Sequence, residues 1–133
     1  MTNPTLLFCY GSLRTGEYNH TLLNHSRKIA DAVIDGFVLY SLGIFPAMVP
    51  SDDPSSQVYG EVFEVDPSEF ACINRMELGA GYVAQEVSAI QTEDLAKTTY
   101  QCLTYIFRDS KWLQDFAEIV PSGDWIKRGD HHA

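Results

Sequence analysis

The chain has 133 residues, 45% hydrophobic and 20% charged, the size and composition of one soluble folded unit, so we expect a single domain over residues 1–133. Asp and Glu outnumber Lys and Arg by 18 to 9, which argues against nucleic acid or an anionic membrane as a partner. Because no apolar run reaches the roughly 18–20 residues of a membrane span and no signal-peptide pattern is present, we expect a cytoplasmic protein.

An apolar segment near the N-terminus ends in a tight turn. The run Leu6–Tyr10 is typical of a buried strand, and Gly11 after it lets the backbone turn without a clash at Cβ. Such a turn can direct successive amide groups, from Gly11 to Leu13, toward one anion. The same residues also fit an ordinary strand-to-loop turn, because short glycine motifs often occur by chance.

Four further segments have the composition of strands. They alternate polar and apolar residues or are rich in β-branched and aromatic ones, and they span Ala32–Leu39, Gln57–Val65, Ala84–Gln91 and Tyr100–Phe107. In the second of these, Glu61 and Glu64 stand among apolar positions, which favours a half-buried strand near an edge or opening of the sheet. The sheet is therefore expected to be mixed or antiparallel.

Helical patterns are few and short, and they cover residues 19–24, 67–76 and 111–118. In the second, Asp66 is a suitable N-cap, with Pro67 at the first helical position. Apolar residues at helical spacing place Glu77 at the end of this helix, on or near its inward side. A carboxyl group buried there, before a glycine-rich turn and Tyr82, would have a raised pKa suited to proton transfer. The alternative is a solvated glutamate at a helix end.

Strands with few helices, separated by proline and glycine turns, predict an α+β fold. We expect a mixed, barrel-like sheet of about five to six strands with a few short flanking α-helices. Phe45-Pro46 and Gly79-Ala80-Gly81 are two of the predicted turns. Because a small closed sheet fills its interior with side chains, a binding pocket would lie at its mouth, where loops gather.

The three cysteines are widely spaced, and each has apolar neighbours. Cys9, Cys72 and Cys102 therefore fit buried free thiols better than a disulfide framework or a metal site. A nucleophilic Cys9 would need a base beside it, and nothing in the sequence places a histidine there. We expect no metal site.

These motifs, in this order, resemble the gamma-glutamylcyclotransferase-like family. The resemblance covers nearly the whole chain and rests on residues 8–13 (Phe-Cys-Tyr-Gly-Ser-Leu), 19–23, 40–47, 59–66, 76–77 and 82. The closing Ser122-Gly123-Asp124-Trp125 is similar to the tail of the small bacterial YtfP-like branch of that family. The resemblance implies a barrel in which the loop after the first strand forms one wall of a cavity and Glu77 faces it.

The implied activity is that of a cofactor-independent enzyme that converts a gamma-glutamyl amine or gamma-glutamyl amino acid to 5-oxoproline and a free amine. Glu77 would act as general base and then as general acid. The loop would hold the substrate carboxylate or the oxyanion through backbone amides. The implied substrate-binding residues are Tyr10, Gly11, Ser12, Leu13 and Tyr82.

The sequence departs from the family pattern at two places. Many relatives have arginine two positions after the tyrosine, where this chain has Ala84, and Ile73-Asn74 replaces the usual Leu-Asp before the glutamate. Loss of the arginine removes a cation that could anchor a carboxylate. A non-catalytic, small-molecule carboxylate-binding protein on the same fold is therefore the alternative function, and the sequence leaves the oligomeric state open.

Overall fold

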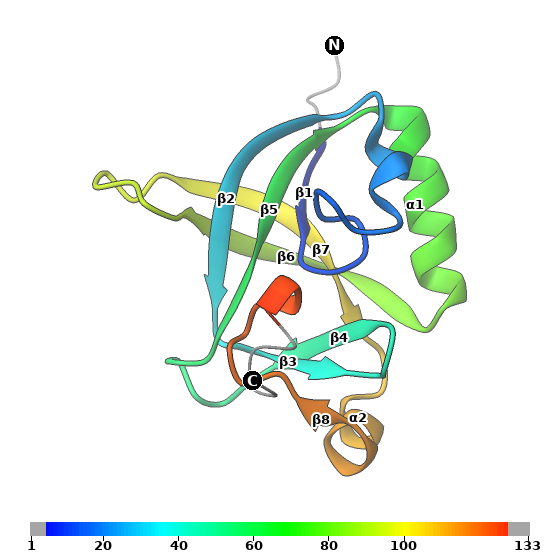
Figure 1. Ribbon diagram of the computed structural model, residues 1–133, viewed down its shortest axis with the longest axis vertical. Coiled ribbons are helices and arrows are strands. Elements are labelled where there is room, and N and C mark those ends of the chain that lie inside the picture. Colours follow the sequence, from blue (N-terminus) through cyan, green and yellow to red (C-terminus); the bar gives the residue numbers. More distant parts are fainter. Residues whose placement is uncertain (1–4, 128–133) are drawn as a thin grey trace.

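The computed structural model describes residues 5–127, and its central feature is a closed β-barrel (Figure 1). In order around the barrel, its strands are β1 (Thr5–Cys9), β5 (Gln57–Val65), β2 (Arg27–Asp35), β6 (Tyr82–Gln91) and β7 (Thr99–Phe107). β1 pairs with β5 in antiparallel and with β7 in parallel orientation, and the other paired neighbours are antiparallel. The predicted α+β class and mixed, barrel-like sheet are thereby confirmed.

A second, smaller sheet packs beside the barrel. It contains, in spatial order, β4 (Pro46–Pro50), β3 (Phe37–Ser41) and β8 (Glu118–Ile119). The prediction of one strand over Ala32–Leu39 is wrong, because Gly36 adopts a φ of 80° and separates β2 of the barrel from β3 of this sheet. Strand β4 was not predicted, since prolines usually mark turns. Here the two prolines stand at its ends, and the residues between them are buried.

Four short helices complete the described part of the chain. They are η1 (His20–Leu23), α1 (Pro67–Gly79), α2 (Ser110–Phe116) and η2 (Trp125–Lys127), of which η1 and η2 are 3-10 helices. Figure 1 shows α1 along one side of the barrel with η1 beside it. The α1 side chain of Ile73 is fully buried, whereas Cys72 is exposed on the outer face. The prediction of a buried thiol is therefore wrong for Cys72, because adjacent helical residues point in different directions. No helix in residues 5–127 is both long and apolar enough to cross a membrane.

The predicted start of α1 is confirmed by its capping contacts. The Asp66 carboxylate accepts hydrogen bonds from the backbone amides of Ser68 and Glu69, at 3.1 and 3.3 Å. These amides belong to the first helical turn and have no acceptor within the helix. The cap therefore fixes where α1 begins. It thereby also helps to set the position of Glu77, which lies near the other end of the same helix.

Replacing Asp66 with alanine is expected to lower the free energy of unfolding by about 1 kcal/mol, because two amides lose their acceptor. Urea denaturation followed by circular dichroism measures this change. Asp52→Ala is the matched control, since Asp52 is exposed and the charge change is the same. Equal stability of the two variants would show that the cap contributes nothing.

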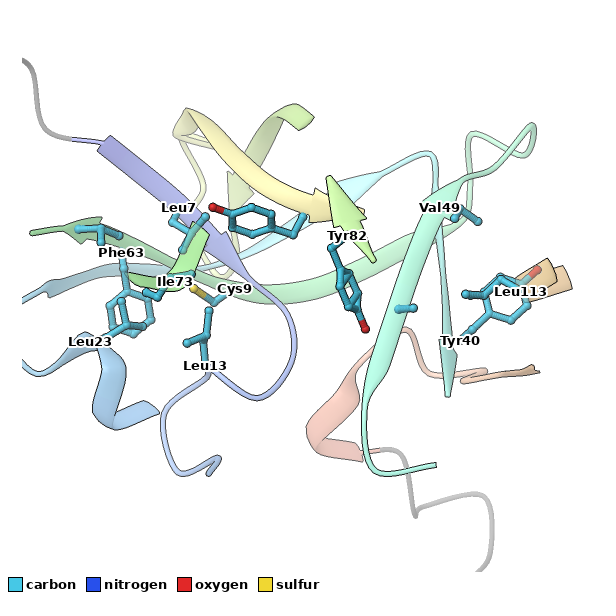
Figure 2. Packing of buried hydrophobic residues seen from close by; sticks show 13 residues of the cluster. Leu7, Cys9, Leu13, Leu23, Tyr40, Val49, Phe63, Ile73, Tyr82 and Leu113 are labelled. Carbon is cyan, nitrogen blue, oxygen red and sulfur yellow. The ribbon is translucent and has the colours of Figure 1, made fainter. Parts of the chain in front are cut away.

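A hydrophobic cluster holds the barrel, the loop after β1 and α1 together (Figure 2). Leu7 and Phe63 come from barrel strands, Leu13 from the loop, Leu23 from η1 and Ile73 from α1. This shared core fixes the loop and the end of α1 relative to each other.

Strand β5 has the predicted bounds but not the predicted setting. It lies between β1 and β2 in the closed barrel, and Glu61 on it is only 2% exposed. Of the predicted half-buried strand near an edge or opening, the half-burial and the edge are therefore wrong, because β5 has a partner strand on each side and most of its residues are buried. An acidic residue at a fully buried position needs charged or hydrogen-bonding partners.

Candidate functional site

A cavity of about 340 Å³ opens between the loop after β1, the end of α1 and the start of β6. The structure brings all six residues singled out from the sequence to its walls. They are Tyr10, Gly11, Ser12, Leu13, Glu77 and Tyr82. The remaining lining residues are Leu7, Phe8, Cys9, Tyr18, Asn19, Leu42, Phe45, Pro46, Met76, Ala80, Tyr105 and Phe107.

Glu77 is the one charged side chain among the described residues that line this cavity. It sits near the C-terminal end of α1 and is half-buried. Its carboxylate has no ion pair or hydrogen bond with another described residue, and burial raises its pKa to about 7. Burial raises the pKa of Tyr10, Tyr82 and Tyr105, and the charge of Glu77 raises it further. All three tyrosines line the same cavity as Glu77.

The raised pKa of Glu77 predicts a pH-dependent cost to folding. The carboxyl ionises near 4.5 in the unfolded chain and near 7 in the folded one, so its ionisation favours unfolding as pH rises through this interval. The full cost is about 3 kcal/mol above pH 7. Glu77→Gln, which cannot ionise, is expected to match the wild type below pH 4.5 and to exceed its stability by up to about 3 kcal/mol at pH 8.

Urea denaturation at several pH values tests this expectation. Glu86→Gln is the control, because Glu86 is exposed on β6 outside the cavity. A stability difference between Glu77→Gln and wild type that stays constant from pH 4 to pH 8 would contradict the raised pKa.

Three backbone amides of the loop after β1 are unused, and their residues line the cavity. The amides of Gly11, Ser12 and Leu13 donate no hydrogen bond to another described residue. The turn is closed instead by Arg14, whose amide donates to the Gly11 carbonyl at 3.0 Å. A row of three free amides can bind a carboxylate or an oxyanion.

Gly11 is required here for a reason other than the predicted one. Its φ is not in the left-handed region, so the turn itself does not demand glycine. A Cβ at this position would instead lie 2.5 Å from Cγ of Pro46. Close packing of the loop against β4 therefore excludes any larger residue.

Tyrosine hydroxyls in the cavity wall are hydrogen-bonded to the protein. The Tyr10 hydroxyl donates to the Tyr105 carbonyl at 2.6 Å, and the Tyr82 hydroxyl donates to the Pro46 carbonyl at 2.7 Å. In the view of Figure 2, Tyr82 lies between the cluster side chains around Leu7 and those around Val49. Burial and the charge of Glu77 raise the pKa of both phenols, so they stay protonated at neutral pH.

Cys9 also lines the cavity, on its buried side. Burial raises the pKa of its thiol well above the ordinary value. A thiol is nucleophilic only as the thiolate. The structure therefore agrees with the interpretation of Cys9 as a buried thiol.

A buried charge network behind the loop was not predicted. Arg14 Nε lies 3.0 Å from Glu61 Oε2, and Arg14 Nη1 lies 2.6 Å from Asp124 Oδ1. The Thr15 amide and hydroxyl donate to Glu61 Oε1 at 3.1 and 2.7 Å. Burial opposes ionisation of Glu61, but the hydrogen bonds from Thr15 and Arg14 outweigh it and hold its pKa below the ordinary value. The network fastens the amide loop to β5 and to the C-terminal segment.

The departure from the family pattern at Ala84 lies outside the cavity. Ala84 is exposed on β6 and is not among the lining residues. Within residues 5–127, no group of three or more His, Cys, Asp or Glu side chains is placed to hold a metal ion.

Comparison with known proteins shows which sequences and folds this chain resembles. The family model for gamma-glutamyl cyclotransferase, AIG2-like proteins matches residues 7–127. A Vibrio cholerae protein with the provisional name gamma-glutamylcyclotransferase is 31% identical over 125 residues, which span 92% of this chain and 96% of the relative. The Escherichia coli gamma-glutamylcyclotransferase family protein YtfP is 29% identical over 123 residues, with the same two coverages.

Solved structures show the same fold. An uncharacterised protein from Pyrococcus horikoshii has a TM-score of 0.74 and 26% identity, with 96% of each chain covered. An AIG2-like protein from mouse has a TM-score of 0.78 and 19% identity, with coverage of 98% of this chain and 94% of the mouse protein. At that identity, the second likeness concerns the fold alone.

Proposed function

Because the chain belongs to the gamma-glutamyl cyclotransferase, AIG2-like family, we propose that it releases 5-oxoproline and a free amine from a gamma-glutamyl amine or gamma-glutamyl amino acid. The reaction is internal to the substrate. The α-amine nitrogen forms a bond to the γ-carbonyl carbon, and the bond from that carbon to the leaving nitrogen breaks. The substrate α-ammonium loses two protons as its nitrogen becomes the ring N–H, and both end on the leaving nitrogen, which departs as an ammonium. This chemistry needs neither a metal nor a cofactor.

Glu77 carries the proton in this proposal. Its carboxylate takes a proton from the substrate α-ammonium and then gives a proton to the leaving nitrogen. A group with a pKa of about 7 is suited to both transfers at neutral pH. The observation that supports this role is the position of the carboxylate, which lines the cavity without a protein partner among residues 5–127.

The loop on the facing wall would bind the anionic parts of the substrate. The free amides of Gly11, Ser12 and Leu13 can hold the α-carboxylate or the oxyanion that develops on the γ-carbonyl. One amide donor aimed at an oxyanion contributes about 3 kcal/mol to transition-state stabilisation. Tyr10 and Tyr82 would shape the pocket between the loop and Glu77. The Tyr82 hydroxyl oxygen can accept a hydrogen bond from the substrate ammonium, whereas the Tyr10 oxygen is already hydrogen-bonded to the backbone at Met48.

To test this proposal, the purified protein is incubated with a panel of gamma-glutamyl amines and gamma-glutamyl amino acids. We expect release of 5-oxoproline, measured by chromatography, together with one equivalent of amine. Isothermal titration calorimetry with the same compounds covers the alternative function. Binding of these compounds without release of 5-oxoproline would contradict the proposed enzyme activity and support the alternative, a carboxylate-binding protein.

A further inference from the structure

The cavity offers few hydrogen-bond donors to a ligand. Its three buried tyrosines direct their protons into the protein: Tyr10 to the Tyr105 carbonyl, Tyr82 to the Pro46 carbonyl, and Tyr105 to Asn74 Oδ1 at 2.8 Å. Each hydroxyl has a single proton to donate. None of these three hydroxyls is therefore a donor toward a ligand.

Most of the donors that remain lie on the loop wall. They are the amides of Gly11, Ser12 and Leu13 and the Ser12 hydroxyl, whose oxygen already accepts from Asn19 Nδ2 at 2.9 Å. Elsewhere in the lining, the donors include the second N–H of the Asn19 side chain and the hydroxyl of Tyr18, both of them neutral. If the glutamyl α-carboxylate occupies the loop amides, a second carboxylate in the substrate meets only neutral donors.

No positive side chain compensates for this shortage among the described lining residues. None of them is Lys, Arg or His, and the one charged group is the acidic Glu77. Arg14, which follows the loop directly, is held by Glu61 and Asp124 behind it. A second carboxylate would therefore lose its hydration without gaining a counter-ion, and it would be repelled by Glu77.

The exposed and half-buried lining residues mark the mouth of the cavity, and besides the polar Ser12, Asn19 and Glu77 they are aromatic or aliphatic. Tyr18 is 71% and Phe45 is 40% exposed, and Leu42, Met76 and Phe107 are half-buried. With the glutamyl head between the loop and Glu77, the leaving amine would face this apolar rim. An apolar amine would bury carbon surface there, which favours binding.

We propose that this site selects gamma-glutamyl amides whose leaving amine is apolar, preferably aromatic, and carries no carboxylate. The inference rests on the proposed function for the placement of the glutamyl head. It separates two substrate groups that the family assignment leaves together, gamma-glutamyl amines and gamma-glutamyl amino acids.

Two pairs of compounds test the inference, each differing by one carboxylate. Gamma-glutamyl-phenethylamine is compared with gamma-glutamyl-phenylalanine, and gamma-glutamyl-pentylamine is compared with gamma-glutamyl-norleucine. We expect kcat/KM for 5-oxoproline release to be at least about tenfold higher for the member of each pair that lacks the added carboxylate. Equal or higher values for the members that carry it would overturn the inference.

Selectivity is also measured as binding, so that its failure is distinct from failure of the proposed activity. Calorimetry on the wild type compares the Kd values of the first pair without reference to turnover. A preference for the phenethylamine compound supports the inference even where no 5-oxoproline forms. Equal affinity, or tighter binding of the phenylalanine compound, contradicts it whether or not the chain is catalytic.

A variant of the rim adds a second test. Phe45→Arg places a cation at the mouth of the cavity. It is expected to raise kcat/KM, or affinity, for gamma-glutamyl-phenylalanine. The preference for gamma-glutamyl-phenethylamine over gamma-glutamyl-phenylalanine should therefore become smaller. Phe116→Arg is the matched control, because Phe116 is 72% exposed on α2 and does not line the cavity. An unchanged preference in Phe45→Arg, with a folded protein shown by circular dichroism, would argue against the rim as the selecting surface.

Discussion

Replacing Glu77 with glutamine is expected to lower kcat for 5-oxoproline release by about 10²–10⁴-fold. The amide keeps the size of the side chain but can neither accept the proton of the substrate ammonium nor return one to the leaving amine. KM should change less, because the loop amides still hold the substrate carboxylate. Steady-state kinetics on the best substrate of the panel measures both constants, and Glu86→Gln serves as the exposed control.

The same role predicts the pH dependence of the wild type. Glu77 must be ionised to accept a proton, so kcat/KM should fall as pH decreases through about 7. This decrease of kcat/KM at acidic pH should be absent from the residual activity of Glu77→Gln. A variant that retains more than a tenth of wild-type kcat, or that keeps the same decrease at acidic pH, would remove Glu77 from the proposed mechanism.

Replacing Arg14 with methionine should lower the free energy of unfolding by about 3–5 kcal/mol at pH 7, more than any other substitution proposed for this protein. The Arg14 side chain has 8% and the Glu61 side chain 3% of its surface exposed, so the variant leaves a buried carboxylate without its main counter-ion. Lys28 Nζ lies 3.7 Å from Glu61 Oε1, and at this distance it replaces only part of the attraction that the carboxylate loses with Arg14. Urea denaturation measures the loss.

Arg27→Met is the matched control for Arg14→Met. Arg27 is also paired with a glutamate, Glu64, but its side chain is 71% exposed, and exposed pairs contribute about 0–1 kcal/mol. Adding Glu61→Gln to Arg14→Met should recover part of the lost stability, because the unpaired charge is then removed. Similar losses in Arg14→Met and Arg27→Met would show that burial of the network has no energetic consequence.

Local patterns were sufficient to predict much of the fold. The strand Gln57–Val65 has the predicted bounds, and the N-cap at Asp66 is confirmed by its hydrogen bonds. The pattern failed where two strands follow each other without a loop, at Gly36, and where proline stands inside a sheet, at Pro46. In both places the side chains are apolar as expected, but the partner strand is set by tertiary contacts that local sequence does not contain.

The candidate site also has one part that the sequence could predict and one part that it could not. Glu77 and Tyr82 could be placed near each other because they are close in the chain and separated by a glycine turn. The charge network could not be predicted, since Arg14 meets Glu61 across 47 residues and Asp124 across 110. An arginine directly after the loop and a glutamate at an apolar strand position were the available signals. Neither specifies the other as its partner without the barrel that brings them together.

The position of β1 between β5 and β7 determines when the site can exist during synthesis. The Thr104 hydroxyl donates to the Phe8 carbonyl at 2.9 Å across 96 residues of chain, so the first strand made must wait for the last strand of the barrel. At 5–20 residues per second, the ribosome adds that stretch in roughly 5–20 s. Throughout this interval the apolar segment that carries the amide loop lacks a neighbour on one side, which makes it a natural target for chaperones that bind nascent chains.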